Sequence, residues 1–122
     1  MADECKLAGA RVLVIEDDDL SALVAEEMLA ELGCAVAGVA ASVEAARAAL
    51  ESAEPPDCVM LDVRLGEELA SDIATHLIKT DTPFIICSGY GIKLPGMNIP
   101  VVDKPYTIET LGTALDQALS RR

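Results

Sequence analysis

The chain has 122 residues, of which 52% are hydrophobic, and its 21 acidic and 9 basic side chains give it a net charge of −12 at pH 7. This length suits one domain, and the apolar content is sufficient for a continuous core, which excludes an intrinsically disordered chain. The acidic balance disfavours nucleic acid as a partner, and the lack of an apolar run of about 20 residues argues against a membrane span.

Residues 11–15 form the first predicted strand, and a helix follows them. The run Arg-Val-Leu-Val-Ile is short, apolar and rich in β-branched residues, which is typical of a strand buried on both faces. It ends at four consecutive acids, residues 16–19. Apolar residues then recur at helical spacing up to Gly33, a residue suited to ending a helix. The face that we expect this helix to bury consists of Leu20, Leu23, Val24, Met28, Leu29 and Leu32.

A weaker strand over residues 35–39 is followed by an alanine-rich helix. Ser42 is suited to be the N-cap of this helix, because its hydroxyl can accept a hydrogen bond from an N–H group of the first turn. The helix must end before Pro55, since proline cannot continue a helix. A third strand covers residues 58–61 and ends at Asp62.

The C-terminal half predicts two more strands and two more helices. We expect a helix over residues 66–79, a fourth strand over residues 83–87 and a very short fifth strand over residues 101–102. Thr107 is suited to cap a final helix. The side chains expected on the buried faces of these two helices are Ile73, Leu77 and Ile78 in the first, and Ile108, Leu111, Leu115 and Leu119 in the second.

Strands that alternate with helices predict a parallel sheet with helices on both faces. Because crossovers in such sheets are right-handed, few arrangements are possible. Five βα units in a chain of this length fit the α/β, flavodoxin-like, doubly wound five-stranded sheet with the strand order 2-1-3-4-5. We therefore expect one domain over residues 11–122, preceded by an N-terminal tail over residues 1–10.

Polar side chains stand where four of the predicted strands end. The carboxyl ends of parallel strands share one edge of the sheet, where open α/β sheets bind their ligands, so these side chains are expected to converge. Clustered carboxylates repel one another unless a cation compensates them, and oxygen ligands of this kind suit Mg²⁺. The residues concerned are Glu16, Asp17, Asp62, Ser88, Asp103 and Lys104.

These residue types allow phosphoryl chemistry. A carboxylate can attack phosphorus and form an aspartyl phosphate when the charge around it is neutralised. Asp62 is the best candidate nucleophile, because it stands alone at the end of a central strand. Glu16 and Asp17 are interpreted as metal ligands. Lys104 is interpreted as the partner of the phosphoryl oxygens, and Ser88 as a hydroxyl that bonds the phosphoryl group once it is attached.

Each of these residues has a simpler explanation when it is taken alone. Acids are favoured at a helix start by the helix dipole, which accounts for residues 16–19. Asp62 can be a turn or cap residue, and Lys104 can be a solvated surface lysine. Their joint placement, each at the end of a different predicted strand, favours a common site.

The cysteines predict a reducing compartment. Cys5, Cys34, Cys58 and Cys87 are widely spaced and form no CxxC pair. Those in the strand-like runs are interpreted as buried thiols. Reduced structural cysteines of this kind are typical of the cytosol, and the N-terminus lacks the pattern of a signal peptide. We therefore expect a cytoplasmic protein.

Four segments resemble the receiver domain of bacterial response regulators: VLVIEDDD (12–19), CVMLDVRL (58–65), IICSGYG (85–91) and VVDKPY (101–106). The resemblance extends over residues 11–119. It implies that Glu16 and Asp17 are the acid pair of the metal site, that Asp62 is the phosphoacceptor, and that Lys104 is the family's lysine.

The same resemblance assigns roles to four further residues. Ser88 corresponds to the switch residue, and the backbone carbonyl of Arg64 is expected to bind the metal. The backbone N–H groups of Val63 and Gly89 are expected to contact the phosphoryl group.

Two features depart from the usual receiver pattern. The position of the aromatic switch residue is Val101, and the segment 89–100, rich in glycine and proline, is too short for a full fourth helix, which we expect to be shortened or absent. Together with the stretch 61–67 and the Gly89-Tyr90 pair, this resembles the FAT GUY subgroup of single-domain receivers. That resemblance implies that Tyr90 and the 89–100 segment report phosphorylation.

The sequence therefore predicts a single-domain response regulator. It would take a phosphoryl group from a histidine kinase onto Asp62 with Mg²⁺, and would signal to an unknown downstream protein or act as a phosphate shuttle or sink. We expect no output domain and no enzymatic activity beyond its own phosphorylation and dephosphorylation. One alternative, an aspartate-nucleophile phosphatase, is disfavoured because Arg64 stands where such enzymes carry a second acid. The other, a degenerate receiver, is disfavoured because the site residues are present.

Overall fold

The computed structural model describes residues 7–52, 54–62, 71–88 and 99–120, together with the backbone of residues 64–65 and 68–69. Its central sheet has five parallel strands in the order β2-β1-β3-β6-β7. The strands are β1 (Arg11–Ile15), β2 (Ala35–Ala40), β3 (Cys58–Asp62), β6 (Phe84–Ser88) and β7 (Val101–Asp103). Counted along the chain, this is the order 2-1-3-4-5, so the predicted flavodoxin-like fold is confirmed.

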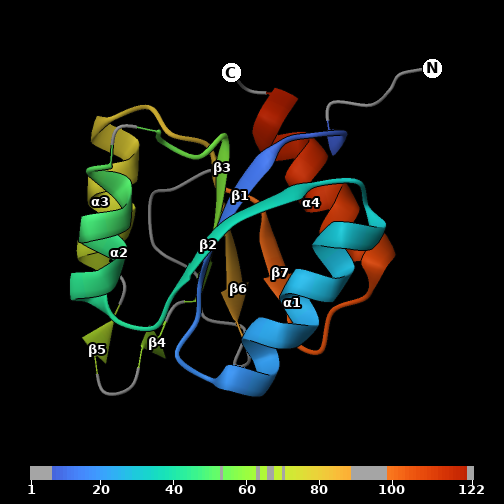
Figure 1. Cartoon of the computed structure of the whole chain (residues 1–122), viewed down its shortest axis with the longest axis horizontal. Coiled ribbons are helices and arrows are strands. Elements are labelled where there is room, and N and C mark those ends of the chain that lie inside the picture. Colours follow the sequence, from blue (N-terminus) through green and yellow to red (C-terminus); the bar gives the residue numbers. More distant parts are fainter. Residues whose placement is uncertain are drawn as a thin grey trace.

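Helices cover both faces of the sheet (Figure 1). One pair consists of α1 (Asp19–Glu31) and α4 (Ile108–Ser120), and the other of α2 (Val43–Leu50) and α3 (Ser71–Lys79). None of the helices in the described part of the chain is long and apolar enough to cross a membrane.

The strands are buried on both sides because each face of the sheet has its own apolar cluster. In β1, Val12 and Val14 belong to the cluster on the side of α1 and α4, whereas Leu13 and Ile15 belong to the cluster on the side of α2 and α3. The alternation follows from the two-residue period of a strand. It explains why the first strand is apolar at nearly every position.

The register of the sheet aligns the carboxyl ends of its strands. One row of paired residues crosses all five strands and consists of Ala40, Ile15, Leu61, Ile86 and Val101. The residue after Ile15 and the residue after Leu61 therefore stand side by side at the same edge. Those two residues are Glu16 and Asp62.

The predicted helix ends at three positions are confirmed. Ser42 is the N-cap of α2, and its Oγ accepts a hydrogen bond from the Ala45 N–H at 3.0 Å. Gly33 follows the end of α1 with a φ of +86°, a conformation that glycine adopts without strain. Thr107 Oγ1 accepts a bond from the Thr110 N–H at 3.1 Å in the first turn of α4.

The segment after β3 differs from the prediction. It contains the short strands β4 (Arg64–Leu65) and β5 (Glu68–Leu69), which pair antiparallel, and α3 begins at Ser71. The predicted helix start at residue 66 is therefore wrong. Leu65 pairs with Glu68 across a two-residue link, which is the common connection of a β-hairpin, so the helix cannot begin before the hairpin ends.

Two predicted buried faces contain exposed side chains. The exposed residues are Leu20, Leu23 and Val24 of α1 and Ile78 of α3, with exposed fractions of 69, 51, 38 and 48%. The buried residues of α1 are Ala22 and Ala25, which were not predicted, and Leu29, which was. Small alanines let a helix approach a sheet closely, so packing decides which apolar stripe of α1 faces inward. The prediction of burial is therefore wrong for Leu20, Leu23, Val24 and Ile78.

Two other expectations reach beyond the described residues. The predicted N-terminal tail is described from Leu7 onward, and Leu7 packs against the cluster on the side of α1 and α4. The shortened fourth helix falls in residues 89–98, which lie outside the described part of the chain. The structure describes the chain again from Ile99, two residues before the start of β7.

Candidate functional site

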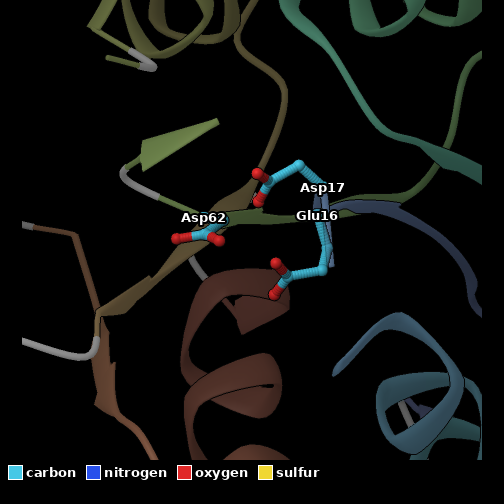
Figure 2. A group of neighbouring side chains, drawn as sticks. All are labelled: Glu16, Asp17 and Asp62. Atoms are coloured by element: carbon cyan, nitrogen blue, oxygen red, sulfur yellow. The ribbon is translucent and has the colours of Figure 1, made fainter. Parts of the chain in front are cut away.

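Three carboxylates meet at the carboxyl edge of the sheet. Glu16 and Asp17 directly follow β1, and Asp62 is the last residue of the neighbouring strand β3. One carboxylate oxygen from each of the three lies within 4.8 Å of the other two. Figure 2 shows that the side chains of Glu16 and Asp17 leave the chain in different directions, while both carboxylates stay close to Asp62. The convergence predicted for these acids is therefore observed.

Glu16 is fixed at both its backbone and its side chain. Its N–H donates to the Ala40 carbonyl at 2.9 Å, which continues the pairing of β1 with β2. Its Oε2 accepts a hydrogen bond from the Asp18 N–H at 3.2 Å. Asp18 is the N-cap of α1 and accepts from the Ser21 N–H at 2.8 Å, a bond that lowers the pKa of the Asp18 carboxyl. The helix-start explanation of the acidic run thus applies to Asp18.

Lys104 reaches into the acid cluster from the end of β7. Its Nζ donates to Glu16 Oε1 at 2.8 Å and to Asp62 Oδ2 at 3.3 Å. Its backbone N–H donates to the Ser88 carbonyl at 2.8 Å, so the base of the side chain is tied to β6. The exposed fraction of the side chain falls from 25% for Lys104 to 12% for Asp62 and 8% for Glu16.

Burial and the ion pair act against each other on the pKa values in the cluster. Burial raises the pKa of Glu16, and the hydrogen bond from Lys104 offsets this only in part, so the pKa stays above its ordinary value. Burial also acts to lower the pKa of Lys104, but the bond to Glu16 and the charge of Asp62 outweigh it and raise that pKa. Lys104 is therefore firmly cationic.

Of the other predicted site residues, the structure describes Ser88 and the backbone of Arg64. Ser88 is the last residue of β6, pairs with Asp103 of β7 and is only 2% exposed. Arg64 lies in β4, two residues beyond Asp62, where the structure describes its backbone. Val63, Gly89 and Tyr90 lie outside the described residues, so their predicted roles stay predictions.

Tyr106 borders the same site and was not among the predicted residues. It is half-buried and, together with Glu16, Asp62 and Cys87, lines a small void at the core side of the cluster. Burial, and to a smaller extent the charge of the nearby Cys87, raises the pKa of Tyr106 to about 12. Its place two residues after Lys104 was the sequence signal that could have identified it.

The acid group has the chemistry of a site for a hard divalent cation. It offers carboxylate oxygens from Glu16, Asp17 and Asp62, and Asp17 is exposed, so a hydrated ion can reach it. Mg²⁺ binds few carboxylates and retains several waters, which suits an open, oxygen-only group of this kind. These residues therefore fit the magnesium site predicted from the sequence.

The chain matches the response regulator receiver domain family over residues 12–98. It resembles the receiver domain of the PhyR response regulator from Erythrobacter litoralis with a TM-score of 0.80 and 29% identity, over 93% of this chain and 92% of that one. For SdrG from Sphingomonas melonis Fr1 the TM-score is 0.81 and the identity 28%, over 94% and 99% of the two chains. The PhyR response regulator from Brucella abortus gives 0.80 and 26%, over 93% and 49%.

The curated relatives are much longer proteins. The chain is 29% identical to the sensor kinase CckA of Brucella abortus (strain 2308), over 93% of this chain and 13% of the kinase. It is 34% identical to ethylene receptor 3 of Oryza sativa subsp. japonica, over 60% of this chain and 9% of the receptor. The chain therefore corresponds to a small part of each of these relatives.

Proposed function

The chain belongs to the response regulator receiver domain family of two-component systems, and from this premise we propose that it is a phosphoacceptor whose reacting group is Asp62. The observation that carries the proposal is the environment of Asp62, whose carboxylate meets Lys104 and lies beside Glu16 and Asp17. In the proposed step, an Asp62 oxygen bonds to the phosphorus of a phosphohistidine while the P–N bond breaks. The histidine ring leaves with the electron pair of that bond.

The position of Asp62 suits a nucleophile. The four residues that precede it in β3 are buried, whereas its own side chain keeps an exposed fraction of 12%. Its backbone pairs with Cys87 of β6, so the carboxylate stands on a rigid strand and still reaches the surface. Phosphoryl transfer depends mainly on positioning and on neutralisation of charge, and a rigid strand end supplies the first of these.

Mg²⁺ is the cofactor that we propose for the transfer. Asp17, Asp62 and Glu16 would hold it, together with the backbone carbonyl of Arg64 that the family resemblance implies. When bound, Mg²⁺ offsets the negative charge of the carboxylates and of the phosphoryl oxygens. The three acids by themselves would repel an incoming phosphoryl group, since Lys104 supplies only one positive charge to the cluster.

Lys104 and Ser88 are the proposed partners of the phosphoryl group after transfer. The ammonium already bonds Asp62, so it can meet the added charge of roughly −1.5 to −2 without a large movement. The Ser88 hydroxyl is proposed to bond a phosphoryl oxygen. The backbone N–H groups of Val63 and Gly89 would supply the remaining donors.

We propose a histidine kinase as the phosphodonor and α1 as the surface on which it docks. Leu20, Leu23 and Val24 are exposed on one side of this helix, which begins two residues after Asp17. Exposed apolar side chains that gather on one surface mark contact sites for proteins. A partner seated there would bring its phosphohistidine within reach of the neighbouring Asp62.

The proposed output is a change of affinity for a downstream protein. The added charge on Asp62 would reorder the region from residue 89 to Lys104, which leads from the end of β6 to the lysine. Val101, at the usual position of the aromatic switch, is half-buried against the cluster on the side of α2 and α3. A valine has no aromatic ring to swing, so Tyr90 and its neighbours are the proposed reporters.

Phosphotransfer to two versions of the chain tests the proposal. Wild-type protein and the Asp62→Asn variant are incubated with Mg²⁺ and either a radiolabelled phosphorylated histidine kinase or acetyl phosphate. Label is expected on the wild type and absent from the variant, and chelation of Mg²⁺ is expected to abolish labelling of the wild type. Equal labelling of the variant would contradict the proposal.

A further inference from the structure

Tyr106 is the aromatic side chain that closes the acid cluster on the side of the core. We infer that Tyr106 is a positioning residue, whose ring keeps water from the core side of Glu16, the acid that anchors Lys104, and so holds the Lys104 ammonium where a phosphoryl group on Asp62 would meet it. The inference rests on the function proposed for Asp62. It adds Tyr106 to the residues that arrange the site before a phosphoryl group binds.

The backbone of Tyr106 is fixed on both sides. Two residues earlier, the Lys104 N–H donates to the Ser88 carbonyl at 2.8 Å. One residue later, Thr107 begins the capping of α4 by accepting the Thr110 N–H at 3.1 Å. These two anchors fix the main chain on either side of Tyr106, and packing against the apolar cluster on the side of α1 and α4 holds the ring.

The ring packs where the acid cluster meets the core. Tyr106 contacts the apolar cluster on the side of α1 and α4, and it lines a void of about 10 Å³. The walls of this void include Glu16 and Asp62 as well as the apolar residues Met60 and Cys87. A space of this size is at the lower limit for one water molecule, so the ring leaves almost no room for water behind the carboxylates.

Loss of the ring would change the environment of the ion pair. Glu16 Oε1 and Lys104 Nζ are 2.8 Å apart, and the attraction between them depends on how much water surrounds them. Between an effective dielectric constant of about 20 and one of about 80, the attraction falls about fourfold. Replacing Tyr106 with alanine would admit water at the void, weaken the bond and leave the lysine free to turn toward solvent.

Binding of Mg²⁺ is expected to change less than binding of a phosphoryl group when the Tyr106 ring is removed. Asp17 is exposed and is not among the residues that line the void. Glu16 and Asp62, the other two proposed Mg²⁺ ligands, do line the void, but they are the acids that Lys104 bonds, so a loosened ammonium leaves their oxygens freer to bind the metal. A loosened ammonium would also repel the metal less, which acts against any loss of metal affinity. The inference thus separates binding of a phosphoryl group from binding of the metal.

Titrations with Mg²⁺ and then with beryllium fluoride at saturating Mg²⁺ test this separation. Beryllium fluoride stands in for the phosphoryl group on the aspartate. The variants are Tyr106→Phe, which keeps the ring, and Tyr106→Ala, which removes it. Leu119→Ala serves as the matched control, because Leu119 packs against the same apolar cluster and does not line the void. Amide NMR spectra report the fold and both affinities.

The ring-free variant is expected to bind beryllium fluoride about tenfold more weakly than the wild type, with its Mg²⁺ affinity changed by less than about threefold. Tyr106→Phe and Leu119→Ala should retain both affinities within about twofold. The inference is overturned if Tyr106→Ala keeps its affinity for beryllium fluoride, loses both affinities in parallel, or is matched by either other variant.

The same titration separates this inference from the proposed function. A wild-type chain that binds no beryllium fluoride at saturating Mg²⁺ would overturn both. A wild type that binds it while Tyr106→Ala binds it equally well would overturn the role of Tyr106 and leave Asp62 as the proposed phosphoacceptor.

Discussion

Lys104 donates its shorter hydrogen bond, at 2.8 Å, to Glu16 and its longer one, at 3.3 Å, to Asp62. The lysine is therefore anchored on an acid that follows β1, while it also reaches the acid at the end of β3. Asp62 shares the ammonium with a more deeply buried carboxylate. An incoming group with several anionic oxygens can compete for that ammonium, and this property suits a residue that is to be modified.

Removal of the Lys104 charge is expected to destabilise the fold. In Lys104→Met the buried Glu16 carboxylate loses its counter-charge, and the unfolding free energy at pH 7 in the absence of Mg²⁺ should fall by about 1.5–3 kcal/mol. Urea unfolding followed by circular dichroism measures the change. Lys79→Met, at an exposed lysine of α3, is the control and should change the free energy by less than about 0.5 kcal/mol.

A double variant shows whether the loss comes from the pair. If Lys104 stabilises the chain by compensating Glu16, then Glu16→Gln/Lys104→Met should recover most of the stability lost in Lys104→Met. Free energies of the two substitutions that simply add would contradict this account of the pair.

Loss of the Asp17 carboxylate is expected to weaken Mg²⁺ binding more than loss of the nearby Asp19 carboxylate. Asp17 belongs to the acid cluster, whereas Asp19 is the first residue of α1 and does not. Asp17→Asn should raise the Mg²⁺ dissociation constant at least about tenfold, and Asp19→Asn should raise it less than about threefold, because each removes one charge but only one removes a ligand. Isothermal titration calorimetry or NMR measures both constants. Equal effects would indicate a diffuse acidic field in place of a site.

The exposed side of α1 is expected to serve phosphotransfer from a protein and not from a small molecule. Leu23→Asp should slow labelling by a cognate phosphorylated kinase about tenfold or more, while labelling by acetyl phosphate stays within about twofold of the wild type. Ile78→Asp, at an exposed apolar residue of α3, is the matched control and should affect neither rate. A Leu23→Asp variant that accepts phosphate from the kinase at the wild-type rate would rule out docking at this part of α1.

The Cys87 thiol is expected to be inert in the folded chain. Burial raises its pKa from 9.0 to about 12, so at pH 8 roughly one molecule in 10⁴ carries the reactive thiolate. Because the folded state binds this proton more tightly than the unfolded state, the resulting stability is present below pH 9 and is lost as the pH rises further.

Alkylation checks this expectation. A Cys5→Ser chain treated with iodoacetamide at pH 8 should show Cys87 unmodified by mass spectrometry, and the same chain in concentrated urea should show it modified. Rapid modification of Cys87 without urea would mean that the strand end beside Asp62 is open to solvent.

The strand ends and the acid cluster could be predicted because their signals are local. Glu16 and Asp62 each follow a short apolar run, and parallel pairing brings the ends of such runs to one edge. The same rule predicted that Lys104 lies at this edge, since Lys104 comes directly after β7. That Lys104 lies closer to Glu16 than to Asp62 depends on side-chain geometry, which the pattern does not contain.

Other features depend on packing and were missed for that reason. In α1, apolar residues occur on several sides, so periodicity alone could not show that Ala22 and Ala25 face the sheet while Leu20 and Leu23 face solvent. After β3, a hairpin of β4 and β5 stands where the start of a helix was expected. The hairpin depends on pairing between backbone groups, and strands of two residues are too short to show a clear sequence pattern. Tyr106 lines the site because its side chain packs against the apolar cluster on the side of α1 and α4, a contact that the sequence pattern does not contain.

The most direct test of the central claim is the chemical identity of residue 62 after phosphorylation. Borohydride reduces an aspartyl phosphate to homoserine, which peptide mass spectrometry can locate. After incubation with Mg²⁺ and a phosphorylated histidine kinase, homoserine is expected at position 62 and at no other aspartate. Homoserine at Asp17 or another acid, or a phosphorylated chain in which residue 62 is still aspartate, would contradict the account.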